Sequence, residues 1–265
     1  MFTLSGTGFV WLTLCCLGGV IVLVAGTALV AHRRGRVSVM DVTWGLGFVA
    51  VAAVAAALGG GDLTRRLVVL VVVAVWGARL AWHIHRRNRG REDPRYEKLM
   101  AEAPGSPFAY AATRVFVPQG LLIWLVGMPI QVSALAGPGV RAVLVLGVAV
   151  WLVGLLFEAV GDAQLARFKA DPANRGRLMT TGLWAWTRHP NYFGDACVWW
   201  GVFVVAASAW PGVLTFASPV LMTVILVWGT GARMTERSMA GRPGWDEYAA
   251  RTSGFVPIPP RRRRP

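Results

Sequence analysis

The sequence predicts an all-α polytopic membrane protein, a bundle of about seven transmembrane helices. The 265-residue chain has a mean hydropathy of +0.52, and 55% of its residues are hydrophobic while 15% are charged, which is too apolar for a soluble domain. Several apolar runs also approach the roughly 20 residues that a helix needs to cross a bilayer. The net charge of +14 comes mainly from arginines between these runs, so membrane topology explains it better than nucleic-acid binding. We therefore expect no nucleic-acid partner.

The predicted spans follow one another along the chain with mostly short connections. They cover residues 9–30, 38–58, 66–84, 115–135, 140–160, 192–208 and 211–231. No basic segment precedes the first run and three arginines follow it, so we expect a retained span rather than a cleaved signal peptide. With the N-terminus outside, the inner segments hold 23 basic residues and the outer segments hold 3. This asymmetry predicts a multi-pass protein of the cell membrane with its C-terminus in the cytoplasm.

We expect a single membrane domain with two functional halves. Residues 1–114 would carry an acid on the substrate side, residues 115–258 would carry the cofactor-binding motifs, and residues 259–265 would form a basic tail that touches anionic membrane lipid. The three cysteines show neither a CxxC pair nor the spacing of a metal site, so no metal is predicted. The chain has no GxGxxG or P-loop motif, so a nucleotide would not be held by a Rossmann turn.

The polar side chains in the second and third spans require an explanation, because placing a polar side chain inside a bilayer costs free energy. Asp41 lies near the inner end of the second span, where desolvation favours the protonated carboxyl that a proton donor requires. Alternatively, Asp41 is an interfacial acid or forms an ion pair with Arg79 of the third span. Arg79 shares a helical face with His83 and Arg86. That face fits either a phosphate-binding wall or the ordinary basic rim of a membrane helix.

Charged residues also share one face where the fifth span continues beyond the membrane. Asp162 and Lys169 follow Glu158 by four and eleven residues, close to whole numbers of helical turns. The two carboxylates could bind hydroxyls and an amide while the amine takes a phosphate. Equally, the carboxylates could simply be solvated.

Reactive side chains are most concentrated in residues 182–195, just before the sixth span. This stretch contains Arg188, His189, Asn191, Tyr192 and Asp195. Pro190 suits the first turn of a helix, which would place Asn191 and Asp195 one turn apart on one face. The same residue types gather at bilayer boundaries as interfacial anchors, so a polar site and an anchor remain equally open here.

Five blocks of the sequence resemble the DUF1295 branch of the steroid 5-alpha-reductase superfamily, membrane reductases that use NADPH on an enone. The blocks are residues 41–48, 76–80 with 92–96, 157–169, 182–195 and 236–257. The resemblance implies that Glu158 and Asp162 contact the adenosine half of NADPH, and that Asn191 and Asp195 hold its nicotinamide end. Residues 233–236, Arg-Met-Thr-Glu, are similar to an NADPH-binding Arg-Asp-Asp-Glu signature in their first and last positions only.

The resemblance also implies a reaction and a substrate class. Asp41 matches the acid that, with a tyrosine of the third span, polarises the substrate carbonyl, and no tyrosine occurs in the third span here. The expected reaction is NADPH-dependent reduction of a carbon–carbon double bond conjugated to a carbonyl in a lipophilic, steroid-like molecule, with the cofactor site facing the cytoplasm. Asp41 is the catalytic candidate. The NADPH-binding candidates are Arg79, Glu158, Asp162, Lys169, Arg188, His189, Asn191, Tyr192, Asp195, Arg233, Glu236 and Tyr248.

Two other functions are consistent with parts of the sequence. Membrane methyltransferases of the isoprenylcysteine type, which use S-adenosylmethionine, also show Arg-His-Pro before an aromatic residue and a late glutamate, as at residues 188–190 and 236. The upstream blocks favour the reductases. A non-enzymatic carrier or structural protein is less consistent, because there is no visible inverted repeat and the polar groups gather on one side of the membrane.

Overall fold

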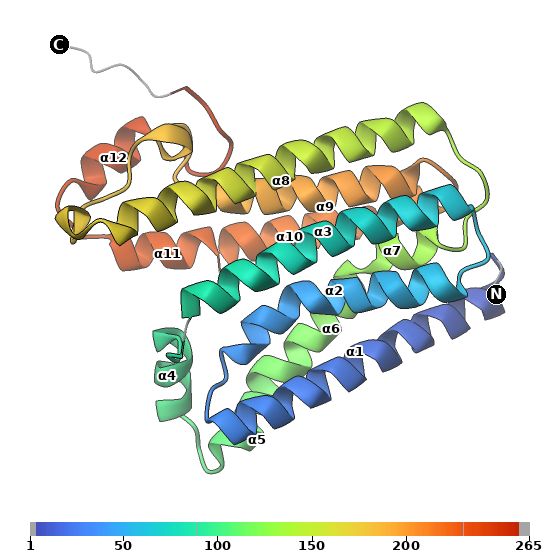
Figure 1. Cartoon of the computed structure of the whole chain (residues 1–265), viewed down its shortest axis with the longest axis horizontal. Helices are drawn as coiled ribbons and strands as arrows, with labels where there is room; N and C mark the ends of the chain where they lie inside the picture. The colour runs from blue at the N-terminus through green and yellow to red at the C-terminus, as the bar shows by residue number, and fades with distance from the viewer. Residues whose placement is uncertain (1–3, 89, 230, 260–265) are drawn as a thin grey trace. The chain divides into compact units, whose positions relative to one another are not determined.

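The computed structural model describes residues 4–88, 90–229 and 231–259, and these residues form helices and connecting loops without a β-strand (Figure 1). They fall into two compact units. The first unit contains the chain up to residue 145 together with residues 202–218, and the second contains residues 146–201 and the chain from residue 219. Residues 260–265 of the predicted basic tail lie outside the described residues.

Six helical segments of the described chain are long and apolar enough to cross a bilayer. They are Gly6–Arg34, Val39–Leu58, Leu63–Asn88, Pro107–Ser133, Arg141–Ala170 and Gly212–Met239. The prediction of an all-α polytopic membrane protein is therefore confirmed. The remaining predicted span, residues 192–208, is the 18-residue helix α9 (Pro190–Ala207), which is not among the six.

In the first unit, helix α2 (Val39–Leu58) packs against both α1 (Gly6–Arg34) and α3 (Leu63–Asn88) (Figure 1). Helices α2 and α3 approach closely where Gly45 faces Gly77, since a Cβ atom on either glycine would lie 2.6 Å from the carbonyl oxygen of the other. The remaining elements are α4 (Pro94–Ala101), α5 (Pro107–Ala111), a π-helical turn (Ala112–Phe116), α6 (Val117–Val126), α7 (Met128–Ser133) and a 3-10 helix (Gly212–Phe216).

Two arginines that the sequence places in an outer loop lie instead in the first turns of α3. Arg65 is 1% exposed, and its guanidinium donates to the carbonyl oxygens of Ala136 and Gly137, the latter at 2.7 Å. The Arg66 guanidinium donates to the carbonyl oxygen of Gly59. These charge-assisted hydrogen bonds satisfy backbone carbonyls after α2 and α7 and hold the start of α3 against the loop after α7.

In the second unit, α8 (Arg141–Ala170) and α9 cross through glycines. A Cβ atom on Gly194 would lie 2.4 Å from the backbone nitrogen of Glu158, and one on Gly161 would lie 3.2 Å from Pro190. Small residues permit such close backbone approach between membrane helices. The crossing places the carboxylate-bearing part of α8 beside the first turn of α9. The other helices are α10 (Ala217–Trp228), α11 (Ala232–Met239) and α12 (Trp245–Arg251).

Candidate functional site

The Asp41 carboxylate is the centre of a polar cluster in the first unit. Tyr96 of α4 donates from its phenol oxygen to Asp41 Oδ1 at 2.5 Å, and Arg95 Nη2 donates to Asp41 Oδ2 at 3.1 Å. The amide of Gln119 in α6 donates from Nε2 to the phenol oxygen of Tyr96 at 3.3 Å. Arg95 is thus an ion-pair partner of Asp41. The pairing of Asp41 with Arg79 stays a prediction.

The loop before α4 holds Tyr96 close to the start of α2. The Glu92 carboxylate accepts hydrogen bonds from the backbone N–H groups of Val37 (2.5 Å) and Ser38 (2.9 Å), where α2 begins. Asp93 caps α4 by accepting from the backbone N–H of Arg95 at 2.9 Å, and it also accepts from the guanidinium of Arg95. The loop is therefore tied to α2 by carboxylate–backbone bonds, and the cap sets the direction of α4.

Burial and charge keep the phenol of Tyr96 protonated. Burial raises the pKa of Tyr96 above its ordinary value of 10.0, and the neighbouring Asp41 carboxylate acts in the same direction. Burial alone would raise the pKa of Asp93. The hydrogen bonds and the charge of Arg95 together outweigh this effect, so the pKa of Asp93 lies below its ordinary value. The cluster thus combines a protonated phenol with ionised groups at one end of a candidate membrane span.

Tyr96 and Gln119 are functional candidates that the sequence reasoning missed. Tyr96 belongs to the block of residues 92–96 but follows the third span, where a search of that span alone does not find it. The sequence Asp93–Pro94 is a helix-start signal that indicates a short helix carrying Tyr96. Gln119 could have been found as a polar residue within an apolar span.

In the second unit, the crossing of α8 and α9 brings together four of the predicted cofactor residues. Asn191 Nδ2 donates to Asp162 Oδ1 at 3.1 Å, and Glu158, Asp162 and Asp195 are 3%, 7% and 8% exposed. Helix α9 begins at Pro190, as the sequence predicts. Lys169 is exposed near the end of α8. Carboxylate and amide groups in this arrangement are suited to binding hydroxyls and an amide.

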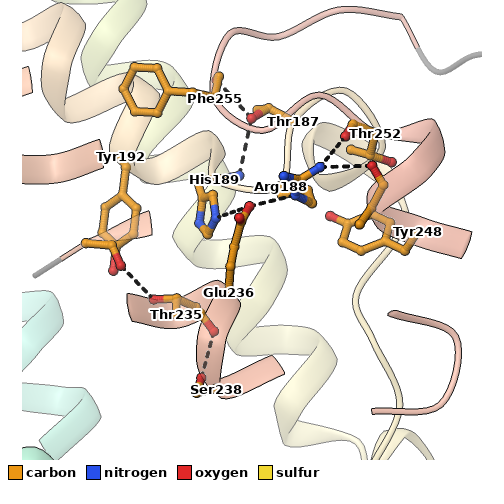
Figure 2. A network of polar contacts seen from close by, with 12 residues as sticks. Thr187, Arg188, His189, Tyr192, Thr235, Glu236, Ser238, Tyr248, Thr252 and Phe255 are labelled. Carbon is orange, nitrogen blue, oxygen red and sulfur yellow. Dashed lines mark hydrogen bonds and ion pairs between the residues drawn. The ribbon is translucent and has the colours of Figure 1, made fainter. Parts of the chain in front are cut away.

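Arg188, His189 and Glu236 form a second cluster in this unit (Figure 2). Arg188 Nε donates to Glu236 Oε1 at 2.7 Å, and the same carboxylate oxygen lies 3.2 Å from His189 Nε2. Arg188 Nη1 also donates to the carbonyl oxygens of Ala249 (3.0 Å) and Thr252 (2.7 Å). The guanidinium of Arg188 is therefore engaged largely within the protein.

Burial lowers the pKa of His189 below its ordinary value of 6.5. The Glu236 carboxylate opposes this effect and the Arg188 guanidinium adds to it. The imidazole also stacks on the ring of Tyr192, with centroids 5.5 Å apart and planes inclined by 20°. His189 is thus a neutral imidazole at neutral pH, oriented by a carboxylate and an aromatic ring.

The C-terminal strap, residues 252–258, runs along the loop that precedes α9. Thr187 Oγ1 donates to the carbonyl oxygen of Phe255 at 2.8 Å, and the backbone N–H of Arg188 donates to the carbonyl oxygen of Ser253 at 2.8 Å. Just before the strap, Tyr248 donates from its phenol oxygen to the carbonyl oxygen of Trp184 at 2.7 Å. The strap and α12 therefore fix the backbone from which His189 and the start of α9 follow.

Of the other predicted residues, Tyr192 is half-buried in the first turn of α9 and joins the Arg188–Glu236 group through its stack on His189. Arg233 is exposed on α11, one turn before Glu236. Arg79 is half-buried on α3 in the first unit. The structure thus assembles most of the predicted residues of the second unit into an α8–α9 group and an Arg188–Glu236 group.

The arrangement can be compared with known proteins. A family described as a protein of unknown function, DUF1295, matches residues 28–252, which include all three polar groups. The chain belongs to the DUF1295 family. Among curated proteins, this DUF1295 protein is similar to an uncharacterized protein of Schizosaccharomyces pombe, with 27% identity over 232 residues, covering 76% of the chain and 66% of the relative. The chain thus spans about two thirds of that relative's length. No solved structure gives a significant match.

Proposed function

We propose that this DUF1295 protein is an NADPH-dependent membrane reductase that acts on a carbon–carbon double bond conjugated to a carbonyl in a lipophilic substrate. The observation that carries the proposal is the Tyr96–Asp41 pair, a protonated phenol hydrogen-bonded to a carboxylate at the end of an apolar span. Such a phenol can stabilise an oxygen that gains negative charge. The family relationship and the buried carboxylates of the second unit are consistent with this reaction.

The cluster around Asp41 would supply the electrophilic half of the reaction. Bound NADPH would supply a hydride to the β-carbon, the electrons of the double bond would move toward the carbonyl oxygen, and a proton from solvent would complete the reduction at the α-carbon. Tyr96 would donate its hydrogen bond to the carbonyl oxygen, because a phenol hydrogen can turn from one acceptor to another. Asp41 accepts from both Tyr96 and Arg95. We therefore assign it the role of holding the phenol in place until the carbonyl oxygen replaces it as the acceptor, rather than donating the proton itself.

The second unit would bind the cofactor on the cytoplasmic side of the cell membrane. The carboxylates of Glu158 and Asp162 suit the hydroxyls of a ribose, and the amide of Asn191 suits a carboxamide or a hydroxyl. Lys169 and Arg233, both exposed, are suited to phosphate groups. The proposal also includes contacts of NADPH with His189, Tyr192 and Asp195.

Ligand-dependent melting of the purified protein tests the choice of cofactor. A ligand present at a hundred times its dissociation constant adds about 2.7 kcal/mol to the free energy of unfolding, which gives a visible rise in melting temperature. We expect this rise with NADPH and none with S-adenosylmethionine. Asn191→Ala should remove most of the NADPH effect while the ligand-free melting temperature stays close to that of the wild type. A rise with S-adenosylmethionine alone would favour a methyltransferase instead.

A further inference from the structure

Two glutamines of the same membrane-spanning segment, Pro107–Ser133, have different surroundings. Gln131 is fully buried; its Oε1 accepts from Thr13 Oγ1 at 2.7 Å and its Nε2 donates to the carbonyl oxygen of Trp124 at 2.9 Å. Gln119 is half-buried and makes a single hydrogen bond to the described part of the chain, the 3.3 Å bond to Tyr96. Gln131 therefore has the environment of a structural residue, whereas the Gln119 amide keeps an oxygen and one hydrogen without a partner among the described residues.

The position of Gln119 on α6 places it on the inward face of the helix. Val117, Leu121 and Leu125 are 55%, 47% and 43% exposed and, at intervals of four residues, form the outer stripe of the helix. Gln119 follows Val117 by two residues, about half a turn away, on the same side as the buried Ile123. An amide on the inward face of a membrane helix is costly unless its hydrogen-bonding groups are satisfied. Gln119 remains partly accessible there, so a bound molecule can satisfy them.

The hydrogen bonds of Tyr96 indicate what that molecule presents to Gln119. The phenol oxygen accepts from Gln119 and donates to Asp41, so the open amide hydrogen of Gln119 lies beside the group to which we assign carbonyl binding. A carbonyl oxygen has two lone pairs and can accept from two donors at once. Tyr96 and Gln119 are two such donors from different helices.

We propose that Gln119 binds the carbonyl oxygen of the substrate through its open amide hydrogen, and so selects lipophilic ketones over hydrocarbons of the same shape. That this carbonyl takes part in the reaction rests on the proposed function. The preference for binding a ketone does not. As a second donor to the oxygen, Gln119 is a specificity-determining residue that contacts the substrate.

The test compares binding of two matched probes in the absence of NADPH. The probes are a steroid 4-en-3-one and the 3-deoxy steroid that lacks its oxygen, and binding is followed by quenching of intrinsic tryptophan fluorescence in detergent. The wild type should bind the enone at least about tenfold more tightly, a ratio that corresponds to one or two net hydrogen bonds. Gln119→Leu and Gln119→Glu should each lose most of this preference, since neither an alkyl group nor a carboxylate offers the amide hydrogen.

Gln131→Leu is the matched control within the same span. It should lower the melting temperature strongly, because it removes the partners of buried polar groups, while Gln119→Leu should melt close to the wild type and keep its affinity for NADPH. An unchanged preference in both Gln119 variants would overturn the inference, and so would a loss of stability in Gln119→Leu equal to that of Gln131→Leu. If the variants lose the preference but no enone supports NADPH consumption, the proposed reaction fails and the Gln119 site stands. If consumption is normal and the preference is unchanged, the reaction stands and the Gln119 site fails.

Discussion

At the scale of single residues, the phenol of Tyr96 is the group on which the proposed chemistry depends most. Tyr96→Phe removes one oxygen atom and leaves the ring in place, so the fold should survive. We expect turnover of an enone to fall by about a hundredfold or more, the usual effect of losing one acid–base or oxyanion-stabilising group. The measurement is NADPH consumption with a panel of lipophilic enones. Tyr110→Phe, in α5 and outside the cluster, is the matched control and should retain full activity.

Asp41 should tolerate substitution better than a residue paired with a deeply buried cation. Its partner Arg95 is 43% exposed in its side chain and keeps a second carboxylate, Asp93, at 2.9 Å. Asp41→Leu should therefore fold and bind NADPH, yet lose turnover because the phenol of Tyr96 is no longer oriented. Melting temperature and NADPH consumption, measured on the same preparation, separate these effects. A folded Asp41→Leu variant with wild-type turnover would remove Asp41 from the mechanism.

His189 gives a prediction for the dependence of stability on pH. Its pKa is lowered from 6.5 in the folded protein, chiefly by burial, so the unfolded chain binds more protons than the folded protein as the pH drops. The stability that His189 contributes is thus complete above about pH 6.5 and is lost as the pH falls through that value. Melting temperatures between pH 7.5 and 5.5 should fall more steeply for the wild type than for His189→Gln. The exposed His85→Gln serves as the control, and equal slopes for wild type and His189→Gln would contradict the prediction.

At the scale of helices, the sequence predicts what the bilayer imposes and misses what tertiary contacts decide. The long apolar runs identify the spans because a bilayer requires about 20 apolar residues in a helix. The helix start at Pro190 was also predictable, since proline is pre-organised for a first turn. The contact between Asp41 and Tyr96 was not, because it depends on the bonds of Glu92 to the backbone at the start of α2, 54 and 55 residues away. Periodicity carries no information about such a pairing.

The crossing of α8 and α9 depends on Gly194. A Cβ atom there would lie 2.4 Å from the backbone nitrogen of Glu158 and 2.5 Å from the carbonyl oxygen of Gly154. Backbone atoms cannot yield as a side chain can, so Gly194→Ala should separate the helices and cost about 1–3 kcal/mol or more. Displacement of α9 should also weaken NADPH binding, because Asn191 and Asp162 would part. Melting temperature and NADPH affinity are the measurements.

Gly18→Ala provides the control for the crossing, because no atom lies within 4 Å of the position its Cβ would take. Alanine in the interior of α1 should leave the protein as stable as the wild type or more stable by about 0.5–1 kcal/mol. Equal effects of the two substitutions would show that the glycine contact does not hold α8 and α9 together.

At the scale of the whole molecule, the structure sharpens the charge asymmetry from which the topology was predicted. Three basic residues are assigned to the outer side. Arg65 and Arg66 are buried and donate hydrogen bonds to backbone carbonyls, whereas Arg141 is exposed. The two buried arginines therefore have a structural reason to be there. The predicted orientation places the N-terminus outside and the C-terminus in the cytoplasm. It stays a prediction, and it requires that α9 crosses the membrane.

Helix α9 must cross the membrane for the two ends of the chain to lie on opposite sides, since the described residues contain six other candidate spans. Its 18 residues extend about 27 Å at 1.5 Å per residue, close to the roughly 30 Å of a hydrocarbon core. We expect it to cross, with Asn191 and Asp195 at the cytoplasmic interface.

In a bacterial host, a green fluorescent protein fused to the C-terminus should fluoresce, as it does in the cytoplasm, and alkaline phosphatase fused to the N-terminus should be active, as it is outside. A phosphatase fused within the loop at residues 137–139 reports the outer side after four crossings, whether or not α9 crosses, and so fixes the orientation independently. Two ends on the same side would show that α9 does not cross, and would place residues 240–259, which follow the last candidate span, on the opposite side from the one proposed for cofactor binding.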